Sequence, residues 1–367
     1  MDITTLGWSE IYRTEFESLN LPDAEPARVS RHYRSAYHVI GETGEKTAQV
    51  TGRLLHLAED PADLPAIGDW VATTTMDERS VLIHKVLPRR ACLSRNVAAS
   101  TRRTEQQILA ANVDVAFLVS GLDNDFNLRR IERYLTGLSQ TGVEPIIVLN
   151  KADLCRELEI RRSDVLEVAG DTPVHIVSAQ THDGVAELSG YLACGKTAVF
   201  LGSSGVGKST LINRLLGGDR LATGEVREDD SRGRHTTTHR ELLVLPDGGV
   251  VIDTPGLREL TLWSESAGVE AVFDDIEVLA SGCRFRDCRH EGEPGCAIQA
   301  ALDSGDLDPK RWASYRKLQA ELSSHQRRMD AKARRAQERQ WSKRISSWKK
   351  EYSKLNKNGE YGRKLKR

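Results

Sequence analysis

The centre of the chain alternates between continuous apolar runs and segments with helical periodicity. Four short apolar runs have the pattern of strands buried on both faces, and they lie at residues 115–119, 146–149, 174–177 and 198–201. Between the first two, apolar residues recur at helical spacing, at Leu128, Ile131, Tyr134, Leu135 and Leu138. Residues 242–245 and 250–252, joined by an Asp-Gly-Gly turn, predict a β-hairpin. The alternation predicts a doubly wound α/β domain over residues 113–265.

A different pattern precedes this domain. Short strand-like segments separated by turn signals lie at residues 36–40, 48–57, 70–74 and 81–87. Several short strands in so few residues predict a small β-barrel of the OB type over residues 35–95. We expect residues 1–34 to be an N-terminal extension with a short helix, and residues 96–112 to be a linker.

The C-terminal end is helical in pattern and strongly basic. From residue 323 to 367, 16 Lys and Arg residues face four acidic ones, although the net charge of the whole chain is −1. We therefore expect a basic helical tail at 323–367 that meets a polyanionic partner. RNA, an anionic membrane or the protein's own surface could each receive the apolar stripe of this tail, which is formed by Trp341, Ile345, Trp348, Tyr352 and Leu355.

The remaining bulk properties limit the class of protein. No apolar run approaches the roughly 20 residues of a transmembrane helix. The N-terminus lacks the basic start and apolar centre of a signal peptide. We expect a cytoplasmic, monomeric protein with no membrane association.

Residues 202–210, which read GSSGVGKST, match the P-loop pattern. A strand-like run precedes them and a helical pattern follows, so the glycines lie in a strand-to-helix turn whose backbone N–H groups can surround phosphate oxygens. We expect Lys208 to reach the β- and γ-phosphates and the Ser209 hydroxyl to bind Mg²⁺. The predicted nucleotide contacts in this loop are Gly202, Ser203, Ser204, Gly205, Val206, Gly207, Lys208, Ser209 and Thr210.

Two further motifs follow other predicted strands and favour guanine as the base. The first is Asn150-Lys151-Ala152-Asp153, in which the Asp153 carboxylate can accept hydrogen bonds from N1–H and the 2-amino group of guanine. Adenine lacks both donors, so a site built for guanine rejects it. The second is Ser178-Ala179-Gln180, whose backbone N–H groups could meet the guanine oxygen. Alone, either motif would pass for an ordinary helix cap or loop.

The metal and γ-phosphate contacts are predicted downstream of the P-loop. Asp253 follows the strand at 250–252 and suits Mg²⁺ through water, while the N–H of Gly256 could contact a γ-phosphate oxygen. A threonine from the segment at 232–238 could close over Mg²⁺, with Thr237 as the first choice and Thr236 as the second. All these motifs lie at carboxyl ends of parallel strands, where such sites form.

The order of the motifs is unusual. GTPases ordinarily carry the P-loop first and the base-reading motifs last, whereas here NKAD and SAQ precede the P-loop. We therefore predict a circularly permuted GTPase domain, because permutation changes the connectivity and leaves the packed arrangement intact.

A cluster of metal-ligating residues follows this domain. Cys283, Cys288, His290 and Cys296 lie within fourteen residues, and three thiolates with one imidazole suit a closed, structural Zn²⁺ site. The alternative, cysteines of an apolar core, conflicts with the charged residues around them. We expect one zinc ion per chain, held by a zinc-binding α-helical domain over residues 266–322.

The combination of these features resembles the circularly permuted, ribosome small-subunit-dependent GTPases (the A family) of bacteria. The resemblance covers roughly residues 35–320 and rests on the barrel, GRHTTT at 233–238, DTPG at 253–256 and the Cys₃His cluster. It implies a GTPase that hydrolyses GTP to GDP and phosphate with stimulation by the 30S subunit. It also implies binding to that subunit and its 16S rRNA and a role late in its maturation.

Two other functions remain open at this point. Leu257 follows DTPG, where several GTPases carry a glutamine that orients water, so the chain could be a GTP-binding RNA scaffold with negligible turnover. A P-loop ATPase is the second alternative, against which NKAD argues. If the chain does hydrolyse GTP, His235 in the 232–238 segment is the local candidate for positioning the water. The alternative is that His235 is a surface residue of a mobile loop and that another group, such as ribosomal RNA, positions the water.

Overall fold

The computed structural model describes residues 1–33, 36–98, 104–221, 241–253, 269, 272–324 and 327. They belong to two compact units, Met1–Asp306 and Leu307–Arg367, and each is described by itself. Within the described residues, no helix is both long and apolar enough to cross a membrane.

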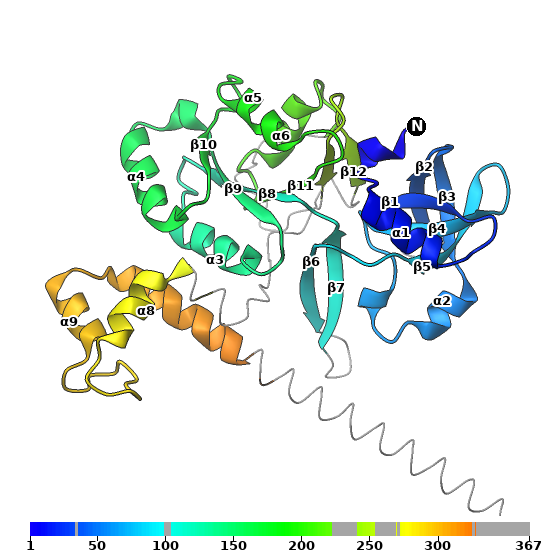
Figure 1. Ribbon diagram of the computed structural model, residues 1–367. Coiled ribbons are helices and arrows are strands. Elements are labelled where there is room, and N and C mark those ends of the chain that lie inside the picture. The colour runs from blue at the N-terminus through cyan, green and yellow to red at the C-terminus, as the bar shows by residue number, and fades with distance from the viewer. Residues whose placement is uncertain are drawn as a thin grey trace, which may run out of the picture. The chain divides into compact units, whose positions relative to one another are not determined.

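The α/β part of the first unit is built on a six-strand section of sheet (Figure 1). The strand order is β10-β9-β8-β11-β13-β12, and all neighbours are parallel except β12 and β13. The strands are β8 (Val115–Gly121), β9 (Glu144–Asn150), β10 (Val174–Ile176), β11 (Thr197–Leu201), β12 (Glu241–Val244) and β13 (Val250–Asp253). The strands β8 to β10 precede β11 in the chain and lie on one side of it, as the permuted order requires.

Helices cover both faces of this sheet, which confirms the predicted α/β architecture. On one face, apolar residues of α3 (Leu128–Leu138) and α4 (Leu158–Ala169) pack with alternate strand residues such as Leu118 and Ile147. On the other face, α5 (Val185–Leu188) and α6 (Lys208–Leu215) pack on Phe117 and Phe200. Short 3₁₀ turns, η3 (Ala152–Leu154) and η4 (Ser189–Tyr191), complete the connections.

The N-terminal part is a closed five-stranded barrel. Its order is β1-β2-β3-β5-β4, and β1 also pairs with β4, which closes the sheet on itself. The strands are β1 (Glu25–Tyr33), β2 (Ala36–Gly41), β3 (Gly44–Val50), β4 (Trp70–Thr75) and β5 (Ser80–Val86). Before them come η1 (Ile3–Leu6) and α1 (Glu10–Ser18), and between β3 and β4 come α2 (Gly52–Leu57) and η2 (Pro61–Asp63).

Three segments differ from the sequence-based expectation. β1 lies within residues 1–34, because its buried Arg28 and Ser30 disguise the apolar alternation of a strand. The strand predicted at 48–57 ends at Val50, and Thr51 then caps α2 by accepting a hydrogen bond from the N–H of Leu54 at 3.4 Å. In place of a plain linker, β6 (Cys92–Ala98) and β7 (Thr104–Ala111) form a two-stranded antiparallel ribbon.

The barrel is joined to the α/β part by strand pairing and by a buried arginine. β1 pairs with β12 at Arg31 and Glu241, whose side chains also form an ion pair. Arg28 is 1 % exposed and donates to the carbonyl oxygens of Leu6, Gly68 and Asn112. One guanidinium therefore ties η1, the barrel and the residue that follows β7 together.

The C-terminal segments are helical. In the first unit, α8 (Asp274–Ser281) and α9 (Ala297–Ser304) flank the cysteine cluster. In the second unit, residues 309–324 are helical, and the rings of Trp312 and Tyr315 stack at 5.4 Å. Apart from residues 323, 324 and 327, the predicted basic tail lies outside the described residues.

Candidate functional site

The predicted phosphate loop forms the turn between β11 and α6. Gly207 begins the helix with φ +94°, and a Cβ there would lie 2.3 Å from Nδ2 of Asn150. A Cβ on Gly202 would lie 2.3 Å from the carbonyl oxygen of Val119. Both positions need glycine because neighbouring backbone and side-chain atoms occupy the space of a side chain. Ser204 and Gly205, at the tip of the loop, are exposed.

Asn150 holds three predicted loops together. It is 1 % exposed at the end of β9, where its Nδ2 donates to the carbonyl oxygen of Val206 in the phosphate loop at 2.7 Å. Its Oδ1 accepts from the N–H of Ala179 at 3.0 Å. Arg214 of α6 adds a hydrogen bond to the Ala179 carbonyl at 3.1 Å. The structure thus brings the motifs at 150–153, 178–179 and 202–210 to one edge of the sheet.

The side chains predicted to read the base lie beside this junction. Asp153 is exposed, and its Oδ1 accepts from the Ser178 hydroxyl at 2.6 Å, which fixes the orientation of the carboxylate. Lys151 has a left-handed backbone with φ +67°, and its Nζ lies 2.5 Å from Oδ2 of Asp123. The hydrogen bond to Asp123 holds the lysine stem in a defined direction. Ala152 follows in the turn η3.

The predicted phosphate and metal ligands lie at the starts of helices and ends of strands. Lys208 donates from Nζ to the carbonyl oxygens of Gly202 at 2.8 Å and Ser203 at 2.5 Å. Ser209 and Thr210 occupy the first turn of α6, and Asp253 ends β13. Burial raises the pKa of Asp253, while the positive charge of Lys208 opposes the rise. A divalent cation at this carboxylate would favour its ionised form.

Three predicted site residues cannot be compared with the structure. His235, Thr237 and Gly256 all lie outside the described residues.

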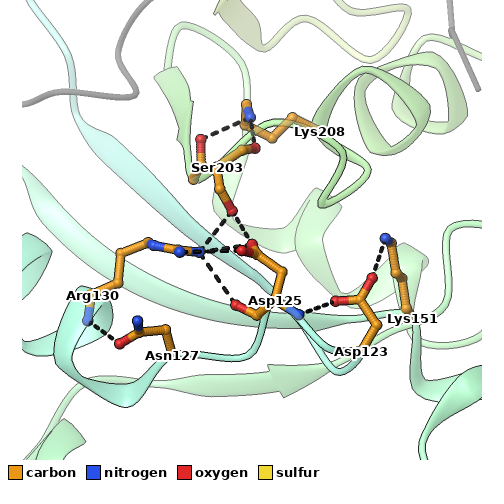
Figure 2. A network of polar contacts seen from close by, with 8 residues as sticks. Asp123, Asp125, Asn127, Arg130, Lys151, Ser203 and Lys208 are labelled. Carbon is orange, nitrogen blue, oxygen red and sulfur yellow. Dashed lines mark hydrogen bonds and ion pairs between the residues drawn. The ribbon is translucent and has the colours of Figure 1, made fainter. Parts of the chain in front are cut away.

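Sequence reasoning missed a group of charged residues after β8. Asp123 and Asp125 lie in the connection from β8 to α3, and Arg130 lies in the first turn of α3 (Figure 2). Arg130 and Ser203 both donate hydrogen bonds to the Asp125 carboxylate. Partial burial raises the pKa of Asp125, but the hydrogen bonds from Arg130 and Ser203 outweigh it and hold that pKa below its usual range. The aspartates follow the carboxyl end of a parallel strand, the signal that identified the other loops.

The cysteine cluster brings together four ligand atoms that could hold a metal ion. The ligand atoms of Cys283, Cys288, His290 and Cys296 all lie within 4.8 Å of one another. Nδ1 of His290 is 3.5 Å from Sγ of Cys283 and 3.4 Å from Sγ of Cys296. A tetrahedral zinc ion bound by sulfur and nitrogen separates such atoms by about 3.6 Å. The four residues therefore fit a zinc ion, with Nδ1 as the histidine ligand atom.

Backbone and side-chain contacts hold these ligands in place. The N–H of Ala297 donates to Sγ of Cys283 at 3.3 Å. The Glu293 carboxylate accepts from the N–H groups of Arg289 at 2.9 Å and Glu291 at 2.8 Å, on either side of His290. These backbone hydrogen bonds lower the pKa of Glu293 to about 2. The turn that presents the histidine, whose φ is +59°, is thereby fixed from both sides.

Comparison with known proteins gives matches to two family models and to several named relatives. A family model described as RsgA GTPase matches residues 86–263, and an ABC transporter model matches residues 185–346, a range that includes the phosphate loop. The protein named small ribosomal subunit biogenesis GTPase RsgA from Opitutus terrae is 46% identical over 353 residues, or 94% of this chain and 96% of the relative. Its namesake from Syntrophotalea carbinolica is 46% identical over 345 residues, or 92% of this chain and 94% of the relative.

Two solved structures have similar folds. YjeQ from Thermotoga maritima has a TM-score of 0.57 and 28% identity, covering 82% of this chain and 98% of its own. YloQ, described as a circularly permuted GTPase, has a TM-score of 0.53 and 24% identity, covering 83% of this chain and 97% of its own. The second likeness concerns the fold alone, and it agrees with the strand order found here.

Proposed function

This chain belongs to the RsgA GTPase family, and on that premise we propose that it hydrolyses GTP in the biogenesis of the small ribosomal subunit. The observation that carries the proposal is the junction at Asn150, which joins the phosphate loop to both base-reading motifs. A P-loop alone would fit many nucleotides, whereas this junction adds a carboxylate at Asp153 that guanine can satisfy.

Each residue of the junction has a role in binding GTP. Asp153 accepts from N1–H and the 2-amino group, with its carboxylate oriented by Ser178. The stem of Lys151 lies over the base. The backbone N–H groups of residues 203–209 surround the phosphates, and the Lys208 ammonium offsets the charge that develops between the β- and γ-phosphates.

The magnesium ligands and the catalytic water belong to the same proposal. Ser209, Asp253 and Thr237 would hold Mg²⁺, which supplies charge neutralisation at the phosphates when it is bound. Gly256 would contact the γ-phosphate through its N–H. His235 would accept a hydrogen bond from the attacking water and fix its direction, since a neutral imidazole is a suitable acceptor near neutral pH.

The proposed partner is the 30S subunit and its 16S rRNA, late in maturation and in the cytoplasm. The names of the relatives support the involvement of the small ribosomal subunit, and the basic tail at 323–367 supports contact with a polyanion. We propose that the chain acts as a monomer and that docking on the subunit brings His235 into place, which raises turnover without new chemistry. One structural zinc ion at Cys283, Cys288, His290 and Cys296 completes the assembly.

The deciding experiment measures phosphate release from GTP and from ATP, with and without purified 30S subunits. We expect slow hydrolysis of GTP by the protein alone, a large increase with the subunit and none with ATP. His235→Ala should keep GTP binding and lose most of the stimulated rate, while the matched control His56→Ala, an exposed histidine of α2, should retain it. GTP binding without any subunit-stimulated release would favour the scaffold function instead.

A further inference from the structure

The connection between β8 and α3 contacts both halves of the candidate nucleotide site. Asp123 accepts from Nζ of Lys151, in the base-reading motif, at 2.5 Å. Two residues later, Asp125 accepts from the hydroxyl of Ser203, in the phosphate loop. The N–H of Asp125 donates to Oδ1 of Asp123 at 3.1 Å, so the two carboxylates belong to one rigid turn (Figure 2).

Arg130 completes the contact with the phosphate loop through a forked geometry. Its Nη1 lies 2.7 Å from Oδ2 of Asp125 and its Nη2 lies 3.2 Å from Oδ1. The same Nη1 donates to the hydroxyl oxygen of Ser203 at 2.8 Å. Asn127 caps the helix by accepting from the N–H of Arg130 at 3.2 Å, which fixes where the arginine stem begins. A planar guanidinium can make these contacts together, whereas a lysine ammonium cannot reproduce the fork.

Ser203 connects this network to the lysine of the P-loop. The Lys208 ammonium donates to the carbonyl oxygens of Gly202 and Ser203, so the orientation of the Ser203 peptide sets the direction of the ammonium. The hydroxyl of Ser203 forms hydrogen bonds with Asp125 and Arg130. Figure 2 shows the resulting order from Arg130 through Asp125 and Ser203 to Lys208.

We propose that Asp125 and Arg130 are positioning residues that act through Ser203 to hold the Lys208 ammonium in register with the nucleotide phosphates. This rests on the proposed function, because it concerns the same GTP site. The geometry distinguishes it from a direct electrostatic role: Arg130 donates to the loop and to Asp125, and its positive charge is already paired with that carboxylate. The shape of the guanidinium is therefore required, and its charge alone does not suffice.

The test compares dissociation constants for a fluorescent GDP analogue. We expect Arg130→Lys and Ser203→Ala each to weaken binding about tenfold, the equivalent of one lost charge-assisted hydrogen bond. Ser203→Thr, which keeps the hydroxyl, should weaken binding less than Ser203→Ala does. Arg162→Lys on α4, a surface arginine 3.8 Å from Glu159, is the matched control and should also equal the parent. Thermal unfolding of each variant verifies that the fold is intact.

Repeating the measurement in a protein that already carries Lys208→Met tests whether Arg130 acts through Lys208. In Lys208→Met, introducing Arg130→Lys should change GDP binding by less than about twofold, because contacting residues on one path are not additive. A full tenfold effect in that background, or parent-like binding by Arg130→Lys itself, would overturn the inference while leaving the proposed function intact. A parent protein that binds no guanine nucleotide would overturn both.

Discussion

Replacing the buried Arg28 tests how the barrel is held to the rest of the first unit. Its guanidinium donates to three backbone carbonyls, and Cζ lies 5.7 Å from the ring centroid of Trp70. Burial lowers the pKa of Arg28 to about 10, so the side chain stays charged at neutral pH. We consider Arg28→Met, which keeps most of the stem, and Arg28→Lys, which keeps the charge and loses the fork.

The expected loss of stability depends on which carbonyl oxygens keep a hydrogen-bond donor. The Gly68 oxygen also accepts from Nδ2 of Asn112 at 3.0 Å, so it remains satisfied in either variant. The carbonyl oxygens of Leu6 and Asn112 lose the arginine donor, at about 1–3 kcal/mol each. The methionine variant recovers part of this because no charge is buried, so we expect about 2–4 kcal/mol of lost stability. The lysine variant keeps a buried charge that cannot reach every carbonyl, and we expect a loss of about 3–5 kcal/mol.

The assay is urea unfolding followed by far-ultraviolet circular dichroism. Trp70 lies beside Arg28, and its ring centroid is 4.8 Å from that of Trp8, so both rings contribute to a tryptophan fluorescence signal that the other four tryptophans of the chain share. Arg53→Met, an exposed position on α2, is the matched control and should stay within about 0.5 kcal/mol of the parent. A lysine variant as stable as the parent would refute the reasoning, because it would mean that charge and not the fork secures the junction.

Three further predictions concern the nucleotide and metal sites. Asp153→Asn should lose preference for GTP and gain affinity for xanthosine nucleotides, whose 2-oxo group suits an amide donor; unchanged affinity for GTP in a competition assay would count against the base-reading role. Asn150→Asp replaces the amide that donates to the Val206 carbonyl at 2.7 Å with a carboxylate oxygen, which is an acceptor like the carbonyl itself. Nucleotide binding, measured by titration, should weaken at least tenfold in this variant. Asn150→Ala, which introduces no charge, should have a smaller effect. Metal analysis should find one zinc ion per chain. A chelator should unfold the segment around Cys283 and His290 before the α/β domain, which hydrogen exchange of the backbone amides would reveal. Metal-free protein whose amides in this segment remain fully protected from exchange would contradict the prediction.

The elements that the sequence predicted well are those whose pattern has a single physical cause. β8 and β9 are buried on both faces, so their apolar runs are continuous, and the amphipathic α3 has one apolar face. The motifs at 150–153 and 178–179 were placed at the ends of such strands, but the hydrogen bond between Ser178 and Asp153 was not predicted. The predicted roles of His235 and Thr237 stay predictions.

The elements that were not predicted depend on contacts that the local sequence pattern does not show. In β1, Arg28 and Ser30 are buried because backbone carbonyls and a neighbouring glutamate satisfy them, which no local pattern reveals. Gly52–Leu57 reads as apolar, yet it forms a helix that buries Leu54 while Leu55 and Leu57 remain exposed. The network of Asp125, Arg130 and Ser203 joins residues 73 to 78 positions apart, so only the fold makes them neighbours.

The pairing of β1 with β12 has a consequence for aggregation through sheet edges. The outer strand of a sheet presents unpaired backbone groups that can recruit a strand from another molecule. The barrel removes this hazard for itself through the β1–β4 closure, and it also covers β12 at the Arg31–Glu241 position. At the opposite edge of the sheet, β10 is only three residues long, so it offers few backbone groups for pairing with another strand. The barrel thus shields one edge of the α/β sheet from edge-to-edge aggregation, which makes the α/β domain a poor candidate for isolation without its barrel.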